Sequence, residues 1–414
     1  MTTAATRMNQ SDLMAPPVAQ TIQTQALFVG LVGAIASIAG AFLAPDSFYS
    51  AYLSGFMFWL GLSLGCMAIL MLHHLVGGAW SIVIRRILES GMMTLPLMFV
   101  LFVPILLHLP RLYFWARPEV LSDPKTDPKI LEIAHSYLNF NGILLRYILY
   151  FAIWIGMAYF LNRWSTEQDS IAGQSTLRFR ALSSIGLVIY SLTISFAVID
   201  WVMSLQARWI STIYGLIFVA GEALSAFCFC VVIEAILGKR KPMSEYLTDT
   251  QVHDHGKLIL AFVMVWTYFN FSQWLIIWAG NLPEEIPWYV RRMNGGWGEV
   301  GMFLALFQFA VPFALLLSRQ LKRKAGTLVR IASWILFMRM VDIFWHVEPG
   351  VSVVRGGESI VALHPTFHLS WLHFTILAGI GGLWTAYFFH NLRSRPLLPV
   401  NAPQTLRLLE TPHE

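Results

Sequence analysis

The sequence predicts an all-α, polytopic membrane protein with ten transmembrane helices. Three observations lead to this class: 57% of the 414 residues are apolar, only 12% are charged, and the mean hydropathy is +0.61. Soluble domains carry about 25% charged residues, roughly twice the fraction found here. Because lipid offers the backbone no hydrogen-bond partners, long apolar segments are expected to cross it as helices.

The apolar residues form ten segments, most of them near the roughly 20 residues that a transmembrane helix needs. The third is short, and Pro96 and Pro104 predict a kink in it. Between the third and fourth segments, apolar residues at helical spacing predict a short surface helix near Ile130–Leu138. The ten predicted spans are 26–44, 51–72, 93–109, 142–161, 182–200, 213–237, 258–279, 298–318, 328–345 and 370–391.

Two pairs of similar stretches indicate an internal repeat. Gly55–Gly61 opens the second span and Gly215–Gly221 opens the sixth, while Ile199-Asp200-Trp201 closes the fifth and Val341–Trp345 closes the ninth. An offset of four spans predicts two parallel four-helix bundles, spans 2–5 and 6–9, with spans 1 and 10 as peripheral helices. Chance recurrence of Gly and Phe is the alternative. The predicted units are 1–25 (tail), 26–50 (peripheral helix), 51–212 (first bundle), 213–369 (second bundle), 370–391 (peripheral helix) and 392–414 (tail).

Lys and Arg are unevenly distributed between the two sides of the predicted membrane. The side that holds both tails carries the greater share. The positive-inside rule therefore predicts that both termini lie in the cytoplasm.

Glu222 is the most unusual residue of the predicted spans. About nine residues at about 1.5 Å each place it roughly 14 Å into its helix, near the middle of a hydrocarbon layer about 30 Å thick. The sixth span contains no basic residue that could neutralise it. An acid at this depth is a functional-site hypothesis by default, with a proton relay, structural burial and a ligand contact as the alternatives.

Other ionisable residues in the spans extend this hypothesis. Arg339 and Asp342 are three residues apart and share one helical face, so they are expected to pair. Asp200 is expected to pair with Arg146, whereas Glu234 lies near the cytoplasmic end, where it could reach water. The candidate residues for a proton path are Glu222, Asp200, Asp342, Arg339, Arg146, Glu234 and His108, with Ser225, Asn270, Ser272, Gln273 and Gln308 as polar groups that could continue it.

The sequence favours neither a metal site nor a redox centre bound by this chain. The three cysteines, Cys66, Cys228 and Cys230, are too few and too dispersed for an iron–sulfur or zinc set. The histidines lie near helix ends, whereas a haem held in a bundle needs facing histidines at membrane depth. No catalytic residue is predicted.

The end of the seventh span, Gln273–Glu285, is rich in aromatic side chains and closes on a polar turn. Such an edge could hold a flat ring such as a quinone, although aromatic residues also form ordinary interfacial belts. The candidates for contact with a quinone are His108, Asp200, Trp278 and Asn281.

Spans 2–9 resemble the NrfD-like family, the membrane subunits of polysulfide reductases. Three stretches, 58–89, 196–216 and 272–285, are more narrowly similar to the ActF-type subunit of bacterial alternative complex III. This resemblance covers nearly the whole chain, roughly 26–391. It implies a bacterial inner-membrane location and a complex that oxidises quinol and passes electrons to a periplasmic acceptor.

The resemblance also implies partners: an NrfD-like, ActC-type paralogue in the membrane, periplasmic subunits carrying iron–sulfur clusters and haem c, and bound lipids. It implies that this chain serves as scaffold and proton-path subunit without its own redox cofactor. Two alternatives stay open, a subunit that binds quinol directly and a free-standing secondary transporter. Nucleic acid is not an expected partner.

Overall fold

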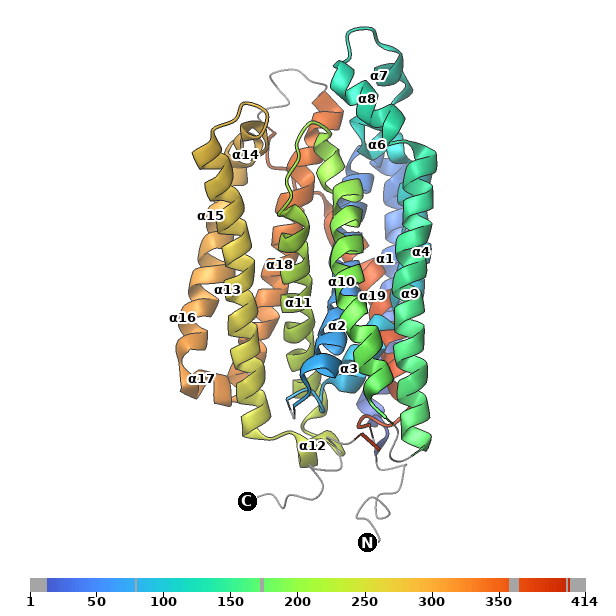
Figure 1. Cartoon of the computed structure of the whole chain (residues 1–414), viewed down its shortest axis with the longest axis vertical. Coiled ribbons are helices and arrows are strands. Elements are labelled where there is room, and N and C mark those ends of the chain that lie inside the picture. The colour runs from blue at the N-terminus through green and yellow to red at the C-terminus, as the bar shows by residue number, and fades with distance from the viewer. Residues whose placement is uncertain (1–12, 79, 172–174, 357–364, 400, 403–414) are drawn as a thin grey trace.

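The structure is a computed structural model that describes residues 13–78, 80–171, 175–356, 365–399 and 401–402, without the side chains of 352–356. This described part is helical and contains no strand. Its long helices run side by side in one elongated bundle (Figure 1). They are α1 (Pro17–Leu43), α2 (Pro45–Val76), α9 (Phe140–Ser170), α10 (Leu177–Trp201), α11 (Tyr214–Leu237), α13 (Asp249–Gly280), α18 (Ala325–Gly356) and α19 (Trp371–Arg393).

Two further segments of the bundle are built from consecutive short helices. The first consists of α3 (Arg85–Met92), α4 (Leu95–Leu101) and α5 (Val103–Leu107), and the second of α15 (Trp297–Leu304), the π-helical turn η5 (Ala305–Ala310) and α16 (Val311–Leu317). The remaining helices are connectors: α6 (Leu109–Leu112), η3 (Phe114–Ala116), α7 (Pro118–Ser122), α8 (Pro128–Ser136), η4 (Met203–Gln206), α12 (Met243–Tyr246), α14 (Ile286–Met293) and α17 (Arg319–Arg323).

Nine helices of the described chain are long and apolar enough to cross a membrane, which supports a multi-pass membrane protein. They correspond to nine of the ten predicted spans. Helix α18 covers the other one, 328–345, but carries Arg330, Arg339 and Asp342 there and is not among the nine.

The third span differs from its predicted bounds. It begins at Arg85 rather than at residue 93, so that Arg85 and Arg86 are inside the helix and buried instead of in a loop. Glu89 stabilises the two buried guanidinium groups, because it accepts a hydrogen bond from Arg85 at 2.9 Å and from Arg86 at 2.6 Å. The helix breaks next to both prolines, as predicted, since α4 and α5 each have a proline in their first turn.

Helices α2 and α11 form the centre of the bundle. They contact each other, and almost all their residues are buried, whereas α1, α13 and the α15–α16 segment are largely exposed on the outside. Glycines permit the closest approaches: a side chain at Gly65 of α2 would overlap the backbone of Glu222 on α11. Helix α1 packs on α19 in the same way, through Gly30, Gly33 and Gly382.

The two ends of the bundle differ. The start of α1 and the end of α19 lie together, because Arg393 donates a hydrogen bond of 2.6 Å to Gln23, and we call this end the termini side. The opposite end, the loop side, carries α6–α8 and α14 (Figure 1). Helix α8 is the surface helix that the apolar spacing predicts, and the Asp127 side chain caps it by accepting from the backbone of Lys129 at 2.9 Å.

Candidate functional site

Glu222 lies inside the bundle, on α11, and is only 3% exposed. Its Oε2 accepts a hydrogen bond of 2.5 Å from the hydroxyl of Tyr190 on α10, while Oε1 has no hydrogen-bond partner within the described residues. On the other side of Glu222 lies Gly61 of α2. A Cβ atom added to Gly61 would be only 3.1 Å from the Glu222 side chain. The carboxyl group is thus enclosed by three helices, with one oxygen bonded to a phenol and one available.

A second group of polar side chains lies between α18 and α11, nearer the loop side. Arg339 of α18 donates to Asp342, as the spacing predicts, and the imidazole Nε2 of His346 is 3.7 Å from the other carboxylate oxygen of Asp342. His346 Nδ1 is in turn 3.1 Å from the hydroxyl of Tyr214 on α11. All four side chains are buried, and Nε2 of His346 faces Asp342 without a hydrogen bond to any described residue.

Arg339 connects these two groups. Its guanidinium occupies the space beside Gly221, where any side chain would overlap it. Gly221 directly precedes Glu222 in the chain, so the cation lies next to the helix turn that carries the acid. Because residue 221 is a glycine, the Arg339 guanidinium of α18 has room to lie against α11 at this position.

Glu234 is paired rather than hydrated, which corrects the expectation that it could reach water. It is 4% exposed, and its Oε2 is 3.0 Å from Nδ1 of His255 on α13. His255 Nε2 is 2.6 Å from the backbone carbonyl of Trp80, an acceptor only, so Nε2 carries a proton. The hydrogen bond to Glu234 then requires one further proton, held either by Nδ1 or by the carboxyl group.

These three groups follow α11 from one side of the bundle to the other. Glu234 lies toward the termini side, Glu222 in the middle and Tyr214 toward the loop side. Twelve residues separate the two acids, which corresponds to about 18 Å along a helix. Ser225 lies between them, buried, with its hydroxyl donated to the carbonyl of Gly221 at 2.8 Å. The structure therefore places ionisable side chains at intervals along α11.

Asp200 belongs to a separate group in the first half of the chain. Its Oδ2 accepts from Arg146 at 2.8 Å and from the hydroxyl of Tyr150 at 2.9 Å, so the predicted pair with Arg146 is present. Arg146 also donates to the carbonyl of Tyr137 and lies 3.9 Å above its ring. This group joins the start of α9 to the end of α10, on the loop side.

The residues that were expected to contact a quinone do not come together within the described structure. His108 is exposed, contacts the carbonyl of Pro104 and packs against Tyr49, whereas Asp200 is 1% exposed and bonded as described above. Trp278 is 67% exposed and stacks on Trp274. Asn281 ends α13 in a left-handed conformation, with a φ of 47°. No hydrogen bond or ring contact among described residues joins these four.

Several polar residues that make contacts in the interior could not be identified from the sequence. Tyr190 and His255 were missed because each takes its role from a partner on another helix, which the sequence does not show. Arg292 of α14 was assigned to a loop, yet it is buried over the ring of Trp288 and donates to the carbonyls of Trp288, Trp345 and His346. Burial lowers the pKa of Arg292 to about 9, and these carbonyls stabilise the charged form.

The described residues contain no group of three or more His, Cys, Asp or Glu side chains that could hold a metal ion, and the three cysteines are buried and unlinked. Comparison of the sequence with protein-family models and with curated proteins gives no match.

Proposed function

We propose that this chain is an integral membrane subunit of a quinol-oxidising electron-transfer complex and that its second half conducts protons. In this proposal it serves as scaffold and proton path, while iron–sulfur clusters and haem c belong to partner subunits. A related membrane subunit of the NrfD-like family lies beside it. The resemblance of the three stretches to the ActF-type subunit of alternative complex III motivates the assignment to such a complex.

The observation that carries the proton path is the series of buried ionisable groups along α11. His255 and Glu234 form its entrance on the termini side, Glu222 with Tyr190 its middle, and Asp342 with His346 and Tyr214 its exit. Acids inside a membrane bundle mark proton relays in pumps and transporters. Ser225 and water molecules bridge the gap of about 18 Å between the two acids, a length obtained from the helical rise.

The same proposal includes ten spans, with α18 as the ninth, in two parallel four-helix repeats with cytoplasmic termini. Gly61 and Gly221, which end the two repeated stretches, each contact an ionisable side chain of a neighbouring helix, Glu222 and Arg339. Helices α2 and α11, which carry these stretches, are the two central helices. These like positions support a duplication.

The test is the substitution Glu222→Gln in the complete complex, reconstituted into vesicles. Gln keeps the shape of the side chain but cannot release a proton. We expect the rate of quinol oxidation to stay within about twofold of the wild type, because in this proposal the partner subunits hold the redox centres. A twofold change in rate corresponds to only a few tenths of a kcal/mol in activation free energy, about 0.4 kcal/mol at 25 °C. The number of protons released per quinol should fall. Glu299→Gln, an exposed acid on α15, is the matched control and should change neither quantity.

An unchanged proton-to-quinol ratio in Glu222→Gln would remove the relay and leave only the scaffold.

The assignment to a complex is tested by purifying the chain from its native membrane. Co-purification with iron–sulfur and haem c proteins supports the assignment, whereas isolation as a single-component oligomer favours a transporter.

A further inference from the structure

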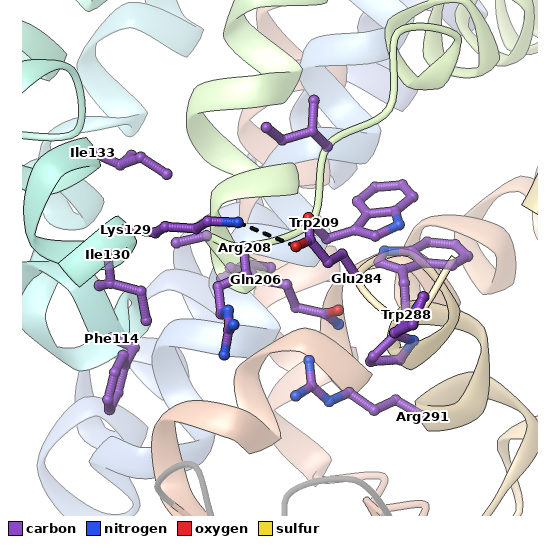
Figure 2. Close-up of a pocket in the computed structure, with 15 residues that line it drawn as sticks. Phe114, Lys129, Ile130, Ile133, Gln206, Arg208, Trp209, Glu284, Trp288 and Arg291 are labelled. Atoms are coloured by element: carbon purple, nitrogen blue, oxygen red, sulfur yellow. Dashed lines mark hydrogen bonds and ion pairs between the residues drawn. The ribbon is translucent and has the colours of Figure 1, made fainter. Parts of the chain in front are cut away.

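A pocket of about 460 Å³ lies on the loop side, between α8, the connector 205–210 and α14 (Figure 2). This volume is within the range of about 300–1,000 Å³ that ligand pockets usually have. Residues of α8 line it on one side and residues of the 283–291 segment on the other. Much of the wall is apolar and is formed by Phe114, Ile130, Ile133, Ile210, Pro283 and Pro287.

Two buried polar side chains line this pocket, Gln206 and Trp209, which are 7% and 3% exposed. Neither amide atom of Gln206, nor the indole Nε1 of Trp209, has a hydrogen-bond partner among the described residues. Native proteins rarely leave buried polar groups without a partner, so these atoms point to a ligand that bonds them.

The pattern of donors and acceptors identifies the chemistry of that ligand. The Gln206 amide offers two N–H donors next to one carbonyl acceptor, and a peptide group offers the complementary N–H and C=O. Trp209 offers one more donor, which suits a second carbonyl. A free carboxylate has acceptors only and would leave the Gln206 oxygen unpaired.

The charges at the pocket favour an acidic side chain on that peptide. Its lining contains Lys129, Arg208 and Arg291 but a single acid, Glu284. Lys129 contacts Glu284 at 3.1 Å, with both side chains exposed, and Arg208, which is 55% exposed, contacts the partly buried Asp127 at 2.9 Å. Exposed ion pairs contribute only about 0–1 kcal/mol, so these cations can take a new partner at little cost.

We propose that the pocket receives an extended peptide segment of a partner protein on the outer side of the membrane. The amide atoms of Gln206 are covered in the observed side-chain position, so this side chain turns toward the pocket to pair with the main chain of the peptide. An acidic side chain of the peptide lies beside Arg208 and Lys129. This inference rests on the proposed function, which supplies a partner on that side.

The experiment places the photo-crosslinking residue p-benzoylphenylalanine at position 210 of the full chain in its native membranes. Ile210 is 64% exposed and lines the pocket. After irradiation, mass spectrometry identifies the attached peptide. We expect one segment of an outer-side protein, with an acidic residue within a few positions of the link. Gln206→Leu should lower the yield at least fivefold, while the same crosslinker at Leu121, on α7 outside the pocket, should give a yield independent of residue 206.

Adducts only with lipid or a small molecule, or a yield that Gln206→Leu leaves unchanged, would overturn the inference. Gln206→Glu, which removes the amide donors and keeps the size, repeats the test if the Leu variant does not fold. A change in proton release by Glu222→Gln without any peptide adduct means that this inference alone fails. A peptide adduct from a protein without redox centres means that the proposed function fails while the pocket remains a peptide site.

Discussion

Each buried acid of the interior has acquired its own neutral or cationic partner. Glu222 is bonded by a phenol, Glu234 by an imidazole and Asp342 by a guanidinium. A carboxyl group taken out of water is costly unless such partners compensate for the lost hydration. The guanidinium is always charged and the imidazole can be charged, whereas the phenol that bonds Glu222 cannot carry a positive charge.

Tyr190→Phe tests the importance of the phenol for Glu222. Removing the hydroxyl leaves a buried carboxyl group without its hydrogen bond, at an expected cost of about 1–3 kcal/mol in the free energy of unfolding. Thermal unfolding in detergent measures this loss. Tyr159→Phe, at a position that is 51% exposed, should leave the midpoint unchanged. Equal midpoints for both variants would contradict the assigned hydrogen bond.

A double-mutant cycle tests the Glu234–His255 pair. His255→Leu leaves Glu234 buried alone and should destabilise the fold by about 3–5 kcal/mol, the usual cost of breaking a buried pair from one side. Replacing both residues with Leu removes the uncompensated group and should recover most of that loss. Additive effects of the two single changes would show that the side chains do not interact.

At the level of the elements, glycines determine how closely the central helices approach. The backbone of Glu222 occupies the space where a side chain on Gly65 would lie, so α2 and α11 are in contact along their main chains. Such contacts are typical of helix packing in membranes, where association depends on close van der Waals fit.

Gly65→Val should therefore force α2 and α11 apart. Overpacking of this kind costs about 1–3 kcal/mol and can exceed that range where the obstacle is backbone. Gly156→Ala is the control, because no described atom beyond its own stretch of helix lies within 4 Å of the added methyl group, and it should raise stability by up to about 1 kcal/mol through helix propensity. Detergent-solubilised yield and melting temperature report both effects, and a melting temperature for Gly65→Val at or above the wild-type value would refute the close contact.

The elements themselves could largely be predicted from the sequence, because apolar length and proline position are local properties. Pairs such as Arg339 and Asp342 were predictable for the same reason, since three residues on a helix share a face. Tyr190 and His255 were not, because their partners come from other helices. The start of the third span was misplaced because Glu89, which neutralises Arg85 and Arg86, lies within the same short segment and was counted as part of a loop.

Across the whole molecule, one buried charge cluster on the termini side links distant parts of the chain. Glu89 of α3 bonds Ser165 of α9 at 2.7 Å and contacts Arg395, just beyond α19, at 3.5 Å. Arg86 pairs with Asp169, also on α9. The cluster thus connects α3 and α9 with the segment that follows α19.

Arg395→Ala should loosen this segment without unfolding the bundle. Arg395 also bonds Asn162 and contacts Thr166 at 3.3 Å, so its removal leaves the donation from Asn401 to the carbonyl of Asp169, at 2.9 Å, as the remaining side-chain hydrogen bond from the described part of this segment to α9. We expect limited proteolysis after residue 394 to accelerate several-fold, while the melting temperature changes little. Arg330→Ala, which removes an exposed cation bonded only within its own helix turn among the described contacts, is the comparison. Cleavage at the same rate in both variants would contradict this linkage.

The contact between Gly65 and the main chain of Glu222 has a consequence for how this protein can evolve. A larger residue at position 65 is tolerated only if α11 shifts, and a shift of α11 would move Glu222 away from Gly61 and Tyr190. Positions 61, 65, 190 and 222 should therefore vary together across homologues, so that lineages which lose the acid also lose the glycines.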